Sequence, residues 1–208
     1  MPVKSPLTRF ALLRHAKTEW NLKKRIQGQD DSPLTQEGEA QAKDWGRILS
    51  DFQWDRIITS DTGRAIKTAS LVNLSLIIPV VNDPRLREQD WGRWTGMTLA
   101  LIEKKEPDYL EEQLAKVWDF CPPEGENRRS VLERSLLALK QAHIRYTGET
   151  ILIVTHEGVI KCLISHLKEN QKQSFEHISF HSDHLHWLTY SEEGLRLEEM
   201  NALSLSDM

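Results

Sequence analysis

The sequence contains very little cysteine. Only Cys121 and Cys162 occur among its 208 residues, and they form no CxxC pair. A disulfide framework is therefore not expected, and a reducing, cytoplasmic environment fits the chain best. Both thiols are interpreted as small side chains that pack in the interior.

Long hydrophobic runs are also absent. The longest, residues 74–81, is interrupted by a serine and a proline and is much shorter than a membrane-spanning helix. Near the N-terminus only residues 10–13 are continuously apolar, and an arginine stands on either side of them. We therefore expect neither a signal peptide nor a membrane span.

An excess of positive charge is missing as well. Lysine and arginine number 27, aspartate and glutamate 31, and the formal net charge is −4. This balance gives no support for a nucleic-acid partner or for an anionic membrane surface. A local basic pocket on such an acidic protein would draw an anionic substrate inward.

Strand-like and helix-like segments alternate along most of the chain, which predicts an α/β fold with a largely parallel sheet. The expected strands are residues 9–13, 55–59, 77–81, 151–154, 177–180 and 184–190. The expected helices are residues 35–51, 61–72, 128–146 and 158–167. Thr35 is the expected N-cap of the first helix. Residues 198–208 form a polar tail that we expect to be frayed.

The segment from about residue 89 to residue 121 differs from the rest because it is rich in aromatic side chains. These are Trp91, Trp94, Tyr109, Trp118 and Phe120. We predict one or two short helices that form a lid, and residues 122–125 end it with a proline- and glycine-containing break. The aromatic side chains either form a small core or wall off a pocket from water. The whole chain, residues 1–208, is then a single domain with the lid inserted.

Polar residues follow three of the expected strands where each strand ends. They are Arg14-His15, Thr155-His156 and Ser60-Asp61, the last followed closely by Arg64. Open α/β sheets bind their ligands at the carboxyl ends of their strands. Two histidines and two arginines at that edge suit a phosphate group and its transfer. Ser60 and Asp61 most simply begin a helix.

These residue types have matching chemistry. Arginine presents a planar fork that fits two phosphate oxygens, so Arg14 and Arg64 are candidate phosphate ligands. A neutral imidazole is a good nucleophile, and nearby arginines disfavour its protonation. No serine or cysteine carries an activation motif such as G-x-S-x-G, so a histidine is the candidate nucleophile.

Taken together and in order, these motifs resemble the histidine phosphatase superfamily, also called the phosphoglycerate-mutase-like family. The matching residues are Arg14-His15, Asn21, Gln27-Gly28, Asp31-Ser32-Pro33-Leu34-Thr35, Gly38, Gln41-Ala42, Ser60-Asp61, Arg64-Ala65, Thr68-Ala69, Leu86-Arg87-Glu88, Trp91-Gly92, Thr155-His156 and Gly158. The resemblance extends from about residue 9 to about residue 190. It implies a three-layer α/β/α sandwich with a mostly parallel sheet and an inserted helical lid. It also implies phosphomonoester hydrolysis through a phosphohistidine, as in the compact branch that includes broad-specificity and α-ribazole phosphatases.

The resemblance also assigns roles by position. The implied catalytic residues are His15, Glu88, His156, Arg14 and Arg64, and the implied phosphate ligands are Arg14, Asn21, Gln27, Gly28, Arg64 and His156. His15 is the nucleophile, and we expect its other ring nitrogen to donate to a backbone carbonyl. Glu88 protonates the leaving group and later deprotonates water, which requires a raised pKa. Neither a metal nor a cofactor takes part in this scheme.

Two positions depart from the family pattern. The residue after the nucleophile is usually glycine, and here it is Ala16. The residue after the second histidine is often glycine, and here it is Glu157. The methyl group of Ala16 is tolerated if its backbone conformation is ordinary. The Glu157 carboxylate either points away from the anion site or weakens phosphate binding.

Several alternatives fit parts of the sequence. A phosphoglycerate mutase-type phosphotransferase shares the core, and an α-ribazole 5'-phosphate phosphatase is a specific case of the favoured function. A phosphate-binding module without turnover is another class. A metallohydrolase would use His177, His181, His184 and His186. For the favoured function the partner is a small phosphorylated metabolite, and the chain is a monomer or a homodimer.

Overall fold

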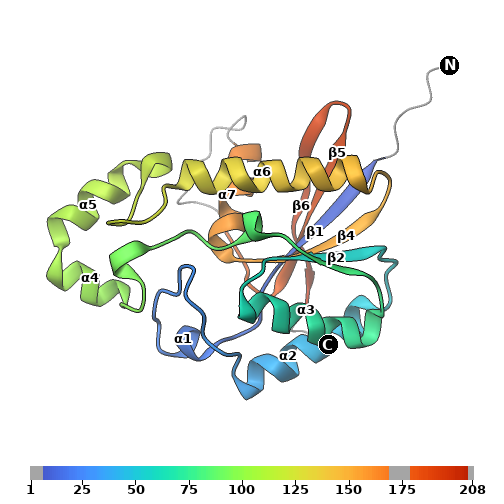
Figure 1. Ribbon diagram of the computed structural model, residues 1–208, viewed down its shortest axis with the longest axis horizontal. Coiled ribbons are helices and arrows are strands. Elements are labelled where there is room, and N and C mark those ends of the chain that lie inside the picture. The colour runs from blue at the N-terminus through green and yellow to red at the C-terminus, as the bar shows by residue number, and fades with distance from the viewer. Residues whose placement is uncertain (1–6, 169–178, 206–208) are drawn as a thin grey trace.

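The computed structural model describes residues 7–168 and 179–205, and a six-stranded sheet lies at its centre (Figure 1). The strands are β1 (Thr8–Arg14), β2 (Arg56–Thr59), β3 (Val80–Asn82), β4 (Thr150–Thr155), β5 (His184–Ser191) and β6 (Gly194–Ser204). Their order in the sheet is β3-β2-β4-β1-β5-β6. The first four in this order are parallel, whereas β5 and β6 form an antiparallel hairpin beside β1.

Helices cover both faces of this sheet (Figure 1). α2 (Gln36–Leu49) and α3 (Gly63–Leu76) pack on one face, and α6 (Arg128–Arg145) and α7 (Glu157–Lys168) on the other. The fold is therefore the expected three-layer α/β/α sandwich with a mostly parallel sheet. Among the described residues, no helix is both long and apolar enough to span a bilayer.

The alternation of side chains along the strands explains the two layers of core. In β1, Phe10 and Leu12 pack with α6 and α7, whereas Ala11 and Leu13 pack with α2 and α3. All four are fully buried, and β4 divides its side chains in the same way. A strand buried on both faces carries a continuous apolar run, which is why β1 and β4 were predictable.

Between β3 and α6 the chain leaves the sheet and forms a separate group of helices (Figure 1). The 3₁₀ helix η1 (Pro84–Leu86) still packs against α6, with Leu86 in the main core. The separate group consists of the 3₁₀ helices η2 (Gly92–Trp94) and η3 (Val117–Asp119), with α4 (Leu99–Lys105) and α5 (Pro107–Ala115). Trp94 and Phe120 are buried with Ile102 and Leu110 in a small core of their own. Two of the aromatic side chains of this segment thus have a structural role.

The prediction of a frayed tail was wrong. β6 continues to Ser204, and Leu205 is buried at 3% exposure in the core beside α2 and α3. Pairing with β5 orders this segment although half of its residues are polar. Residues 206–208 lie outside the described part of the chain.

The strand expected at residues 77–81 begins later, at Val80. α3 runs on to Leu76, and Asn73 closes its end because its side chain exchanges two hydrogen bonds of 3.0 Å with the backbone of Ile78. Of the strand expected at residues 177–180, the first two residues lie outside the described ranges. The other two are not in a strand.

Candidate active site

The two histidines follow matching positions of neighbouring strands. β1 and β4 pair in parallel with Arg14 opposite Thr155, so His15 and His156 leave the sheet together. The His15 amide donates to the Thr155 carbonyl over 2.9 Å, and the centres of the two imidazole rings lie 5.2 Å apart. The carboxyl edge of the sheet therefore brings together the residues that the sequence placed there.

His15 is buried and has one ring nitrogen available for attack. Its Nδ1 lies 2.8 Å from the Ala16 carbonyl oxygen, which can only accept, so Nδ1 carries the proton. This leaves Nε2 with a free lone pair. Burial, and then the charges of Arg14 and Arg64, hold the pKa of His15 well below its ordinary value, so the ring is neutral.

Arg64 is fixed at the start of α3 by a ring of acceptors. Its Nη1 donates to the Asp30 carbonyl at 2.6 Å and to the Asp31 carboxylate at 3.1 Å, and its Nη2 donates to the Gly28 carbonyl at 2.8 Å. A Cβ on Gly63 would lie 2.2 Å from the Asp31 carboxylate, so glycine permits this approach. Sequence reasoning included Asp31 in a motif but gave it no role.

A cavity of about 290 Å³ opens beside His15, and Arg14, Arg64 and Glu88 line it. The Nε atoms of both arginines and the Oε1 atom of Gln27 are buried, with no hydrogen-bond partner among the described residues. A buried polar atom without a partner costs about 1–3 kcal/mol. An anion whose oxygens accept from the two arginine Nε atoms would remove that cost for both of them, which makes this cavity the candidate phosphate site.

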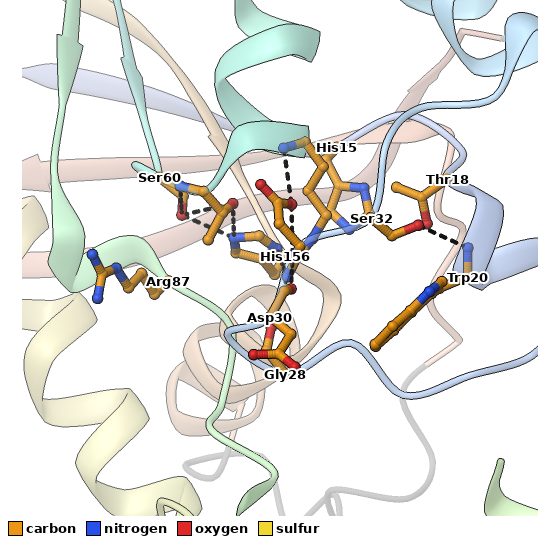
Figure 2. Close-up of polar contacts among 12 residues, drawn as sticks. His15, Thr18, Trp20, Gly28, Asp30, Ser32, Ser60, Arg87 and His156 are labelled. Atoms are coloured by element: carbon orange, nitrogen blue, oxygen red, sulfur yellow. Dashed lines mark hydrogen bonds and ion pairs between the residues drawn. The ribbon is translucent and has the colours of Figure 1, made fainter. Parts of the chain in front are cut away.

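His156 is fully buried and does not line the cavity. Its Nδ1 lies 3.3 Å from Nη2 of Arg64, which can only donate, so the proton is on Nε2. Nε2 donates to the Ser60 hydroxyl over 2.9 Å, and Figure 2 shows the His156 ring turned toward Ser60. Burial, and then the charge of Arg64, lower the pKa of His156 well below its ordinary value. In this arrangement His156 holds Arg64 in place.

Ser60 was expected only to begin a helix, and this reading missed its contact with the site. α3 begins at Gly63, with Thr62 in the N-cap position, and Ser60 instead accepts from His156. The sequence did contain a signal, because Ser60 follows β2 as His156 follows β4.

Glu88 is arranged as an acid. Its two carboxylate oxygens accept from the backbone amides of Gln89 at 2.7 Å and Gly158 at 3.2 Å. Burial raises the pKa of Glu88, and these hydrogen bonds and the nearby arginines only partly offset the effect. A Cβ on Gly158 would lie 2.2 Å from the carboxylate, so this glycine makes room for Glu88.

Asn21, Gln27 and Gly28 also line the cavity. The Asn21 carboxamide has a second task, because its oxygen accepts from the amide and hydroxyl of Thr18 and so caps α1 (Glu19–Leu22). Gly28 has a left-handed backbone with φ of +54°, which turns its carbonyl toward Arg64.

Sequence reasoning missed three cationic residues on the cavity wall, Arg25, Arg128 and Lys161. They come from the loop after α1, the start of α6 and the middle of α7. No local pattern joins residues so far apart in the chain, so only the tertiary fold could have revealed this group.

The structure accounts for both departures from the family pattern. Ala16 is buried, its φ is not positive, and its amide donates to the Thr68 hydroxyl at 3.0 Å, so the added methyl is accommodated. Glu157 does not point away from the site. It lines the cavity and pairs with Arg14 at 2.8 Å and with Lys161 at 2.5 Å.

A cysteine and a group of histidines are the other reactive side chains of interest. Cys162 lines the cavity, but burial raises the pKa of its thiol to about 12, so it stays protonated near neutral pH. In the described part of the chain, no three histidine, cysteine or carboxylate side chains are placed to share a metal ion. His181 and His184 are in ring contact at 4.8 Å, and His177 lies outside the described residues.

Comparisons with known proteins agree with this geometry. The family model described as histidine phosphatase superfamily (branch 1) matches residues 10–203. The chain is 33% identical over 161 residues to an uncharacterized phosphatase, PhoE, from Bacillus subtilis, across 77% of this chain and 78% of that protein. It is 36% identical over 154 residues to a probable phosphoglycerate mutase, GpmB, from Cronobacter sakazakii, across 74% and 72% of the two chains. The solved structure of Bacillus stearothermophilus YhfR superposes with a TM-score of 0.83 at 31% identity, across 95% of this chain and 98% of that one.

Proposed function

Because this chain belongs to the histidine phosphatase superfamily (branch 1) and is a phosphatase of that family, we propose that it hydrolyses phosphomonoesters of a small metabolite through a phosphohistidine on His15. The observation that carries the proposal is the state of His15. Its ring is neutral, its Nδ1 is occupied by the Ala16 carbonyl, and its Nε2 is left beside a cavity walled by two arginines.

The first step transfers the phosphoryl group to the enzyme. Nε2 of His15 attacks phosphorus, the bond to the ester oxygen breaks, and Glu88 gives its proton to the departing alkoxide. Arg14 and Arg64 neutralise the charge on the phosphoryl oxygens throughout.

The second step returns the enzyme to its starting state. Glu88, now ionised, takes a proton from water, which attacks the phosphohistidine and releases inorganic phosphate and neutral His15.

The remaining residues support this reaction. We assign Asn21, Gln27 and Gly28 to the wall that contacts the substrate, since all three line the cavity. His156 acts on phosphate through Arg64, which its Nδ1 contacts. The scheme uses no metal or cofactor. We place the enzyme in the cytoplasm, which suits two free cysteines.

The test is the release of inorganic phosphate from a panel of phosphomonoesters with a chelator present. The wild type, His15→Ala and His166→Ala are compared, because His166 is an exposed histidine away from the cavity. We expect release by the wild type and by His166→Ala, and none by His15→Ala. Equal release by all three proteins would refute His15 as the nucleophile, and loss of activity in the chelator would favour a metal-dependent hydrolase. The panel includes α-ribazole 5'-phosphate, so the preferred ester also narrows the substrate.

A mutase-type phosphotransferase is the second candidate, because GpmB, a relative, is described as a probable phosphoglycerate mutase. Such an enzyme retains the monoester until it is phosphorylated again, whereas a phosphatase admits water. Isomerised product from phosphoglycerate on addition of bisphosphoglycerate, without net phosphate release, would favour the mutase.

A further inference from the structure

Arg14 stands between two cavities. One is the candidate phosphate site, and the other, of about 330 Å³, is lined by Lys17, Gln41 and Trp45. Arg14, His15 and Asn21 belong to both walls. An arginine side chain has several rotatable bonds, so the strand position of Arg14 alone does not decide which cavity its guanidinium faces.

Glu157 lies on the wall of the phosphate cavity and not on that of the second one. Its carboxylate is 2.8 Å from Nη1 of Arg14, and this is a half-buried pair, with side-chain exposures of 22% and 33%. The pair draws the guanidinium toward the phosphate cavity. It leaves Nε of Arg14, which is buried and without a partner in the described chain, to donate to a phosphate oxygen.

A carboxylate beside an anion site also repels the anion, and Lys161 compensates for this. Lys161 lies one helical turn after Glu157 on α7, and its ammonium group pairs with the other carboxylate oxygen. Burial alone would raise the pKa of Glu157. The positive charges of Arg14 and Lys161 together have the larger, opposite effect, so the pKa lies below its ordinary value. Glu157 is therefore ionised, and the three side chains together carry a net charge of one positive unit.

We propose that Glu157 and Lys161 form a positioning pair, in which Glu157 aims Arg14 at the phosphate and Lys161 cancels the charge of Glu157. This inference rests on the proposed function and adds two residues to it. The pair has two separable effects, one on the turnover number and one on the affinity for phosphate. The turnover number depends on a hydrogen-bond acceptor at position 157, whereas affinity for phosphate depends on the net charge of positions 157 and 161.

Three variants test this separation through kcat for an alkyl phosphate and the Kd of inorganic phosphate. Glu157→Ala removes the acceptor, and we expect kcat to fall about tenfold because Arg14 is no longer oriented. Glu157→Gln keeps an acceptor oxygen and should recover most of that loss. Both variants should bind inorganic phosphate about threefold more tightly, and Lys161→Met about threefold more weakly, since each changes the local charge by one unit.

The matched control is Glu193→Ala, which removes an exposed ion pair with Arg196 in the β5–β6 hairpin. It should leave both quantities unchanged. Three results would overturn the positioning pair while leaving the phosphatase activity intact. They are a wild-type kcat in Glu157→Ala, a loss of kcat in Glu157→Gln equal to that in Glu157→Ala, and an unchanged Kd of inorganic phosphate in Lys161→Met. A wild type with no turnover of any monoester would instead refute the proposed function, and this inference with it.

Discussion

At the scale of single residues, the structure shifts two groups of the site in opposite directions, because the pKa of His15 is lowered and that of Glu88 is raised. His15 is kept neutral mainly by burial, and the two arginines add to the effect. Glu88 is kept protonated to a higher pH than usual, again mainly by burial. Burial disfavours whichever form is charged, so it shifts both groups in the direction that the proposed nucleophile and the proposed acid require.

These shifts predict the shape of the pH profile. His15 must be neutral, so kcat/KM is lost as the pH falls through a pKa below the ordinary 6.5 of histidine. Glu88 must be protonated to help an alkoxide leave, so kcat is lost as the pH rises through a pKa above the ordinary 4.5. Glu88→Gln should lower kcat for an alkyl phosphate by roughly 10²- to 10⁴-fold and remove the basic limb.

An aryl phosphate with a good leaving group is the control, since its departure needs little proton transfer. We expect its phosphoryl transfer to depend weakly on Glu88. A basic limb that persists in Glu88→Gln, or an acid limb at or above the ordinary histidine pKa, would show that other groups control the reaction.

The residues that the sequence predicted are those whose role follows from strand ends and from family motifs. Arg14, His15 and Arg64 meet at one cavity as expected. The supporting contacts were harder to predict. Asp31 holds Arg64 from 33 residues away, and no sequence pattern joins the two positions. Ser60 follows β2 beside His156 after the neighbouring strand β4, a signal that sequence reasoning did not use.

At the scale of elements, α6 supports the loop that carries Glu88. Arg134, from the middle of α6, donates to the carbonyls of Arg85 at 2.7 Å, Arg87 at 2.6 Å and Glu88 at 3.0 Å. It also forms two hydrogen bonds of 2.8 Å with the Glu126 carboxylate. One side chain therefore satisfies the carbonyl of Arg85 in η1 and those of Arg87 and Glu88 in the loop that follows.

Loss of this contact should affect both stability and catalysis. The Arg134–Glu126 pair is only 18% exposed on either side, so Arg134→Met leaves the Glu126 carboxylate and the carbonyls of Arg85 and Arg87 without their donor. We expect the free energy of unfolding to fall by about 3 kcal/mol and kcat to fall with it. Arg129→Met is the control, because its pair with Asp119 is 57% and 62% exposed and should contribute much less to stability. Equal effects of the two changes in a denaturant titration would contradict this account.

Elements buried on both faces were predictable, and the edge of the sheet was not. β1 and β4 carry continuous apolar runs, and Thr35 is the expected N-cap of α2, with a hydroxyl that accepts from the Gly38 amide at 2.9 Å. β6 contains Arg196, Glu198 and Glu199, and only its pairing with β5 makes it a strand. Such pairing depends on the rest of the fold, so a polar sequence alone suggested a tail.

At the scale of the whole molecule, the charge of the cavity differs from that of the chain. The net charge is −4, yet five cationic residues line the cavity: Arg14, Arg25, Arg64, Arg128 and Lys161. Their charge faces two carboxylates, Glu88, which is the proposed proton donor, and Glu157. A cleft of one sign concentrates ligands of the opposite sign, so the acidic surface does not prevent an anionic substrate from entering.

The central claim is that the phosphoryl group passes through His15, and the most direct measurement is to locate it there. Glu88→Gln is mixed with an aryl phosphate, so that the phosphohistidine forms but its hydrolysis is slow. The protein is quenched at alkaline pH, digested and analysed by mass spectrometry. The account predicts one phosphoryl group on His15, formed together with a burst of the released alcohol, and no such adduct in a protein that also carries His15→Ala. A phosphoryl group on another residue, or a burst of alcohol with no covalent phosphate, would contradict it.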